Sequence, residues 1–159
     1  MIQTATHPQD ILIFAKDNLA ELNHIHVNAV FNRLGKMANS RDFSPQRLAT
    51  DETFQELLRL VRDFSKSGNY EAQNVSNITH GIAKLHEAGR LDGLDGGVDE
   101  VLAALEREAG RVAPDMDPQH LANTVWAYAK LGQMPGDVVW AALEGAAGRG
   151  GPEGGRQGG

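Results

Sequence analysis

The sequence predicts an all-α protein, built as an α-solenoid of about three stacked helix-turn-helix repeats. The first reason is self-similarity, because residues 26–37, 74–85 and 120–132 align without gaps at steps of 48 and 46 residues. The second is another repeat, in which residues 101–111 (VLAALEREAGR) return as residues 139–149 (VWAALEGAAGR), a step of 38. The third is that no segment shows the apolar–polar alternation typical of a strand.

The aligned copies agree in the character of each position. Apolar residues recur where a helix would face a core, and a small residue and a lysine follow at fixed spacing. These positions are Val27, Val75 and Leu121; Leu34, Ile82 and Tyr128; Gly35, Ala83 and Ala129; and Lys36, Lys84 and Lys130. At 3.6 residues per turn the apolar positions share one face, and the small position lets a neighbouring helix approach closely.

An N-terminal helix that covers the first unit is expected to begin near Pro8. Thr6 and Gln9 form a capping-box pattern, and Pro8 occupies a first-turn position where a missing N–H costs nothing. Apolar residues at helical spacing extend this helix to Leu22. The three units that follow are expected over residues 23–65, 69–112 and 117–144.

The first unit is expected to join a helix capped near Asn23 to a second helix over residues 54–64. A polar stretch with Ser44-Pro45 as a turn separates them, and either Thr50 or Asp51 caps the second helix. Gly68-Asn69 is expected to end it.

The second and third units repeat this order. Helices are expected over residues 69–85 and 98–112, with a Gly/Asp-rich loop over residues 89–97 between them. Asp117-Pro118 begins the next helix, which ends at Gly132, and Asp137 caps the last one. Because no further unit follows the last helix, we expect either a truncated array or an exposed end that awaits more repeats. Residues 145–159 are rich in glycine and are predicted to form a disordered tail.

Composition limits the classes of function. The chain of 159 residues has a net charge of −6 and no cysteine, which excludes disulfides, thiolate nucleophiles and cysteine-bound zinc. The acidic excess is concentrated in residues 92–117, where eight acids accompany Arg107 and Arg111. No apolar run is long enough to span a membrane, and no transit peptide is visible. We therefore expect either a cytosolic protein or a chain that lacks its own N-terminus.

The side of each first helix opposite the core is predicted to form one polar surface across the units. Amides and hydroxyls there suit hydrogen bonding to base edges, an aromatic ring suits stacking on a base, and the lysine row suits phosphates. The candidate RNA-binding residues are Asn28, Asn32, Lys36, Ser76, Asn77, His80, Lys84, Asn123, Trp126 and Lys130.

These residues also have structural interpretations, which the sequence leaves open. Lysines near a helix C-terminus are favoured by the helix dipole without any ligand. Trp126, between small residues, fits helix packing as well as base stacking. Asn77 and Asn123 fit an ordinary solvated face.

Enzymatic interpretations find little support. The six histidines contain no pair at helical ligand spacing, and the glycines after residue 92 lack the lysine and hydroxyl residue of a phosphate-binding loop. We therefore expect no catalytic residues, no cofactor and no metal site.

The strings MDPQHLANTVWAYAKLG, QNVSNITHGIAKL and NHIHVNAVFNRLGKM resemble octotricopeptide repeat proteins, which are related to other helical-repeat proteins with RAP or FAST-kinase-like regions. The resemblance implies binding of single-stranded RNA in a chloroplast or mitochondrion, within complexes that support RNA processing, stability or translation. The first two copies depart from the pattern, since Asn32 and His80 stand where the third has Trp126. The alternative is a protein-interaction solenoid without RNA binding, which the acidic balance favours slightly.

Overall fold

The computed structural model describes residues 7–43, 47–92, 94 and 97–150 of the chain. Every regular element in these residues is a helix, so the predicted all-α class is confirmed. No helix among them is both long enough and apolar enough to cross a membrane.

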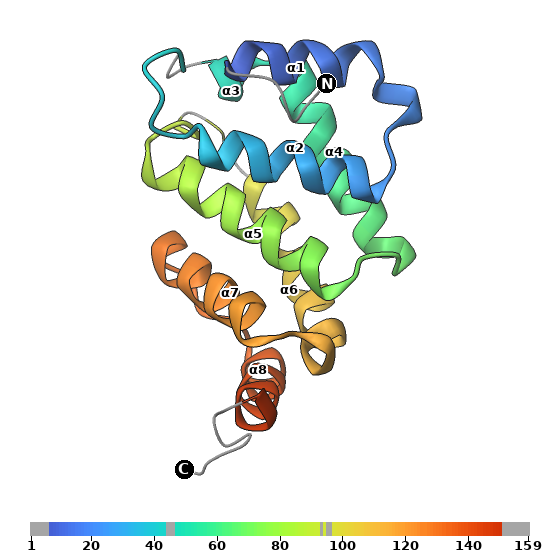
Figure 1. The fold of residues 1–159 in the computed structure, drawn as a ribbon, viewed down its shortest axis with the longest axis vertical. Helices are drawn as coiled ribbons and strands as arrows, with labels where there is room; N and C mark the ends of the chain where they lie inside the picture. Colours follow the sequence, from blue (N-terminus) through green and yellow to red (C-terminus); the bar gives the residue numbers. More distant parts are fainter. Residues whose placement is uncertain (1–6, 44–46, 93, 95–96, 151–159) are drawn as a thin grey trace.

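Six of the helices form two rows. In the first row α5 packs against both α2 and α7, and in the second row α6 packs against both α4 and α8. Figure 1 shows α2, α5 and α7 following one another along the long axis of the molecule, with contacts to the second row at each level. The first row comprises α2 (His24–Lys36), α5 (Ala72–Glu87) and α7 (Pro118–Leu131); the second comprises α4 (Glu52–Ser67), α6 (Gly97–Val112) and α8 (Asp137–Gly150).

The N-terminal helix, α1 (Pro8–Asp17), packs on α2 and α4 through the buried Ile11, Leu12 and Ala15. It is shorter than expected, because the chain leaves the helix at Asn18 and continues as the 3₁₀ turn η2 (Leu19–Glu21). The Asn18 side-chain amide donates to the Phe14 carbonyl at 2.9 Å, and asparagine used in this way favours a helix end. Thr6, predicted to cap α1, lies outside the described residues.

The helices of the first row begin in the same way. In α2 and α7 the cap residue's side chain accepts the backbone N–H of the third helical residue, at 2.9 Å for Asn23 and 2.8 Å for Asp117. The histidine at that third position accepts the cap's own N–H in return. In α5 the corresponding bond runs from the Glu71 N–H to Asn74.

A buried apolar residue precedes each of these caps. Leu22, Tyr70 and Met116 occupy this position, and the residues five positions later, Val27, Val75 and Leu121, are also buried. This spacing is that of a hydrophobic staple, which fixes the direction in which the chain enters a helix. It explains why α5 starts at Ala72 instead of at Asn69 as expected: Tyr70 lies before the helix and packs inward.

The contact between α2 and α5 depends on two glycines. A Cβ atom on Gly35 would lie 2.8 Å from the Gly81 Cα, and one on Gly81 would lie 2.5 Å from the Phe31 carbonyl oxygen. The equivalent positions where α5 meets α7 are Ala83 and Ala127, both fully buried. The prediction that a small residue here lets a neighbouring helix approach closely is therefore confirmed for Gly35. The burial of Ala83 fits the same role, whereas Ala129 is exposed.

Glycines end two of the helices, and an arginine holds the segment that follows α2. Gly68 ends α4 and Gly132 ends α7, with φ of 71° and 70°, a conformation that residues with a side chain rarely adopt. Arg90, just after α5, donates to the carbonyls of Ala38, Ser40 and Phe43 at 2.7, 3.1 and 3.3 Å. Arg90 thereby holds the segment that follows α2. The predicted Ser44-Pro45 turn lies outside the described residues.

Two boundaries differ further from expectation. Arg47–Thr50 forms a short helix, α3, in the stretch expected to be irregular, and Asp51 caps α4 by accepting the Phe54 N–H. Residue 145 was predicted to begin a disordered tail, but α8 continues to Gly150. Its alanines explain this, since Ala146 is only 3% exposed and belongs to the core. Residues 151–159 lie outside the described residues.

Candidate functional site

Two of the candidate residues from different helices meet on the first row. His80 of α5 and Trp126 of α7 occupy aligned positions, and their ring centroids are 4.9 Å apart with the planes at 61°. Edge-to-face contacts of this kind stabilise ring pairs modestly and leave ring surface available. Both side chains are partly exposed, so this pair forms an aromatic surface at the junction of α5 and α7.

Lys130 lies next to this pair. Its Nζ is 5.7 Å from the centroid of the Trp126 ring and 2.9 Å from Oε2 of Glu87. The lysine is thus positioned over an aromatic face and pairs with an acid from the neighbouring helix, an exposed pair that is worth little on its own. A phosphate that approaches Lys130 would compete with Glu87 for it.

The surroundings of His80 favour the neutral form of its imidazole. Partial burial lowers the pKa of its imidazole, and the positive charge of Lys84 lowers it further. A neutral imidazole offers one N–H donor and one acceptor nitrogen, and is suited to a base edge more than to a phosphate.

The asparagines and lysines of the candidate surface differ in accessibility. Lys36 is exposed, and Lys84 is half-buried, as are the asparagines Asn28, Asn32, Asn77 and Asn123. Asn123 accepts a hydrogen bond from Gln119 at 3.1 Å. The buried Oδ1 of Asn28 has no hydrogen-bond partner among the described residues.

Ser76 is not part of this surface, which corrects the prediction. It is fully buried, and its hydroxyl donates to the His120 carbonyl of α7 at 3.3 Å. The helical-wheel assignment placed Ser76 opposite the apolar face. Each middle helix of a row has two neighbours, however, and Ser76 lies on the side of α5 that contacts α7.

Charge is distributed unequally between the two rows. The helices α2, α5 and α7 carry four basic residues (Arg33, Lys36, Lys84 and Lys130) against one acid, Glu87. The helices α4, α6 and α8 carry nine acids against six basic residues. The first row is therefore basic although the protein as a whole is acidic. The net charge of the sequence did not show this difference between the rows.

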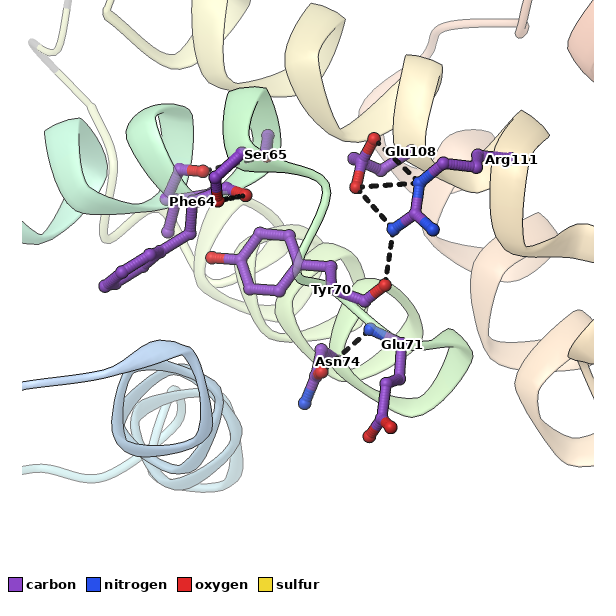
Figure 2. A network of polar contacts seen from close by, with 9 residues as sticks. Phe64, Ser65, Tyr70, Glu71, Asn74, Glu108 and Arg111 are labelled. Carbon is purple, nitrogen blue, oxygen red and sulfur yellow. Dashed lines mark hydrogen bonds and ion pairs between the residues drawn. The ribbon is translucent and has the colours of Figure 1, made fainter.

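A second polar cluster joins the rows and was missed in the sequence. Arg111 of α6 donates to the Glu108 carboxylate at 2.7 Å and to the Tyr70 carbonyl just before α5, as Figure 2 shows. The hydrogen bond with Glu108 raises the pKa of the Arg111 guanidinium. Burial raises the pKa of the Tyr70 phenol, and the charge of Glu108 raises it further.

This cluster is structural in character. Glu108 is only 7% exposed, and a buried carboxylate requires a partner such as Arg111. The Tyr70 ring packs against Phe64 and His24, with centroids 6.4 Å apart in each case. The end of α4, the start of α5 and the start of α2 are thereby held together.

The described part of the chain was compared with the requirements of a metal site, and the whole sequence with known families. Among the described residues no group of three or more histidines, aspartates or glutamates could hold a metal ion. Comparison with protein-family models, with curated proteins and with solved structures found no match.

Proposed function

We propose that the chain is an RNA-binding module in which helical hairpins stack as an α-solenoid and single-stranded RNA follows the polar side of α2, α5 and α7. The observation that carries the proposal is the excess of basic residues on this row, where aligned positions also present amides and rings. Helical-repeat proteins read single strands by presenting a few side chains from each repeat to one base.

Each residue type has a distinct role in this proposal. A base would stack on the exposed part of Trp126, next to His80, while Asn77 and Asn123 would bond to base edges. Lys36, Lys84 and Lys130 would meet successive phosphates. By the resemblance of its repeats, the chain would act on transcripts of a chloroplast or mitochondrion, within a complex that processes, stabilises or translates them.

The salt dependence of RNA binding tests the lysine row. On single strands each phosphate contact contributes about 0.7 to the slope of log affinity against log salt. Changing Lys36, Lys84 and Lys130 together to alanine should lower the slope by roughly 1.4–2.1, the lower figure applying if Glu87 already neutralises Lys130. Fluorescence anisotropy with a labelled oligoribonucleotide measures it.

A matched control removes the same charge elsewhere. Lys16 of α1 and Arg59 and Lys66 of α4 are exposed, and their alanine triple variant should leave the slope unchanged. Equal losses in both triple variants would show that binding reflects only overall charge, and would contradict a defined RNA path.

A protein-interaction module is the second candidate function. The overall charge of −6 favours it, because an acidic protein repels nucleic acid over most of its surface. A protein partner bound without dependence on salt, together with no measurable RNA binding, would support this alternative over RNA.

A further inference from the structure

A cavity of about 290 Å³ lies between the segment after α5 and the end of α7. This volume is close to the lower end of the range for ligand pockets, roughly 300 Å³, so the cavity suits a single side chain. Its walls combine buried or half-buried leucines with exposed polar residues. The leucines include Leu91, Leu102 and Leu131, and the polar residues include Asp92, Asp99 and Gln133.

The same place in the first unit is occupied by Arg90. Its guanidinium donates to three carbonyls of the segment after α2, among them those of Ala38 and Phe43, and lies 5.0 Å from the centroid of the Phe43 ring. At the 48-residue step that relates the first two units, Ala38 and Phe43 correspond to His86 and Leu91. Both of these residues line the cavity, which is therefore the counterpart, one unit later, of the Arg90 site.

Gln133 stands where Arg90 does, but it cannot replace it. Each residue directly follows a glycine with positive φ, 77° at Gly89 and 70° at Gly132. Each also donates its backbone N–H to the carbonyl of the residue five positions earlier, at 2.9 and 3.1 Å, which is the Schellman way of ending a helix. The glutamine side chain is shorter than arginine and uncharged. The cavity is therefore open because of the residue type at this position, within a pair of units that are both present.

The charge around the cavity selects a cation. Asp92 and Asp99 contribute two carboxylates, and none of the described lining residues is a lysine or an arginine. A phosphate would be repelled here, so the cavity is distinct from the basic row proposed to bind RNA. An arginine suits both parts of the lining, because its methylene stem packs on apolar surface while its guanidinium pairs with carboxylates and carbonyls through several donors.

We propose that this cavity binds an arginine side chain of a partner protein, as the segment after α2 binds Arg90. The stem of the arginine packs on Leu91 and Leu131, and the guanidinium pairs with Asp92 and Asp99. The chain itself supplies only Gln133 at the equivalent place, so the arginine comes from another protein.

An NMR titration with a blocked arginine, N-acetyl-arginine-N-methylamide, tests the site on the whole chain. The backbone amide signals of Leu91, Leu102 and Leu131 should shift and saturate at millimolar concentration. The matched probe is the blocked citrulline, which has the same shape without the charge and should cause no such shifts. Free L-arginine carries a carboxylate of its own and should bind more weakly. No shifts with the blocked arginine, or equal shifts with citrulline, would overturn the proposal, and tighter binding of the free amino acid would overturn its assignment to a protein partner.

Charge variants test the two carboxylates. Asp92→Asn combined with Asp99→Asn should weaken the binding of the blocked arginine by a factor of roughly 2–20, the range for two exposed charge pairs. The matched control is Asp17→Asn combined with Asp63→Asn, which removes the same charge from exposed positions on α1 and α4. An equal loss in both double variants would reduce the effect to overall charge and contradict a defined site.

Filling the cavity from within the chain is the sharpest test. Gln133→Arg restores an arginine at the position of Arg90, so it should abolish binding of the blocked arginine and raise Tm by roughly 2–6 °C. Gln133→Lys adds the same charge but only one donor group, and should do less in both measurements. A Gln133→Arg variant that binds the probe as tightly as the natural chain would refute the equivalence of the two sites.

Discussion

Replacing Gly81 by alanine should push α2 and α5 slightly apart and lower the stability of the protein. The new Cβ would lie 2.5 Å from the Phe31 carbonyl oxygen and 3.0 Å from its carbon, and these are backbone atoms that cannot rotate away. The oxygen is about 0.9 Å closer than ordinary contact, so one helix must shift by most of that distance. The shift would loosen a contact that includes the fully buried Phe31 and Ile78.

The expected magnitude follows from two opposing effects. Overpacking a close-packed core costs typically about 1–3 kcal/mol. Alanine in place of glycine inside a helix recovers up to about 1 kcal/mol. We expect a net loss of about 1–2 kcal/mol in the free energy of unfolding, which lowers Tm by roughly 2–8 °C in a domain of this size.

Chemical denaturation with urea measures the change, and Gly148→Ala provides the control. Gly148 lies in α8, and a Cβ there would meet no other atom within 4 Å, so this variant should be slightly stabilised by helix propensity alone. If Gly81→Ala were as stable as Gly148→Ala, the close approach of α2 and α5 would be refuted.

Three other perturbations have defined outcomes. Arg90→Ala removes three hydrogen bonds to carbonyl oxygens and should lower the free energy of unfolding, measured with urea, by about 1–3 kcal/mol. Arg90→Lys should recover only part of this loss, because one ammonium group cannot reach all three carbonyls. The pKa of His80 in the folded state lies below its ordinary 6.5, so between these two values the unfolded chain binds more protons than the folded chain. The free energy of unfolding should therefore fall as the pH drops through this window. His80→Asn should reduce this fall. Trp126→Ala should weaken RNA binding by roughly 1–3 kcal/mol if a base stacks there, and leave it unchanged if the ring serves packing alone.

Three helix starts were predicted well because their signals are local. Asn23, Asp51 and Asp117 act within three or four residues of themselves, and the structure shows all three as caps. The end of α1 and the length of α8 were predicted less well. The first depends on how Asn18 bonds to its own helix, and the second on packing of Ala146 that no local signal records.

The candidate surface was harder to predict than the fold. A helical wheel separates core from solvent, but it does not show which solvent-facing positions a neighbouring helix covers, and this is why Ser76 was misplaced. The contact between His80 and Trp126 and the ion pair between Lys130 and Glu87 join residues more than 40 positions apart. Alignment of the repeats could have suggested the first, since the two rings occupy the same column.

The row arrangement also has a consequence for how the protein opens. Since α5 lies between α2 and α7, the stability of each helix in the row depends mainly on the helices next to it. Local unfolding at one end of the row therefore does not require unfolding at the other. Backbone amides of α5 should therefore exchange with solvent deuterium most slowly, and those of α1 and α8 fastest. A molecule of this kind would fray progressively from its ends and leave a protected centre, so a protease would trim it in steps.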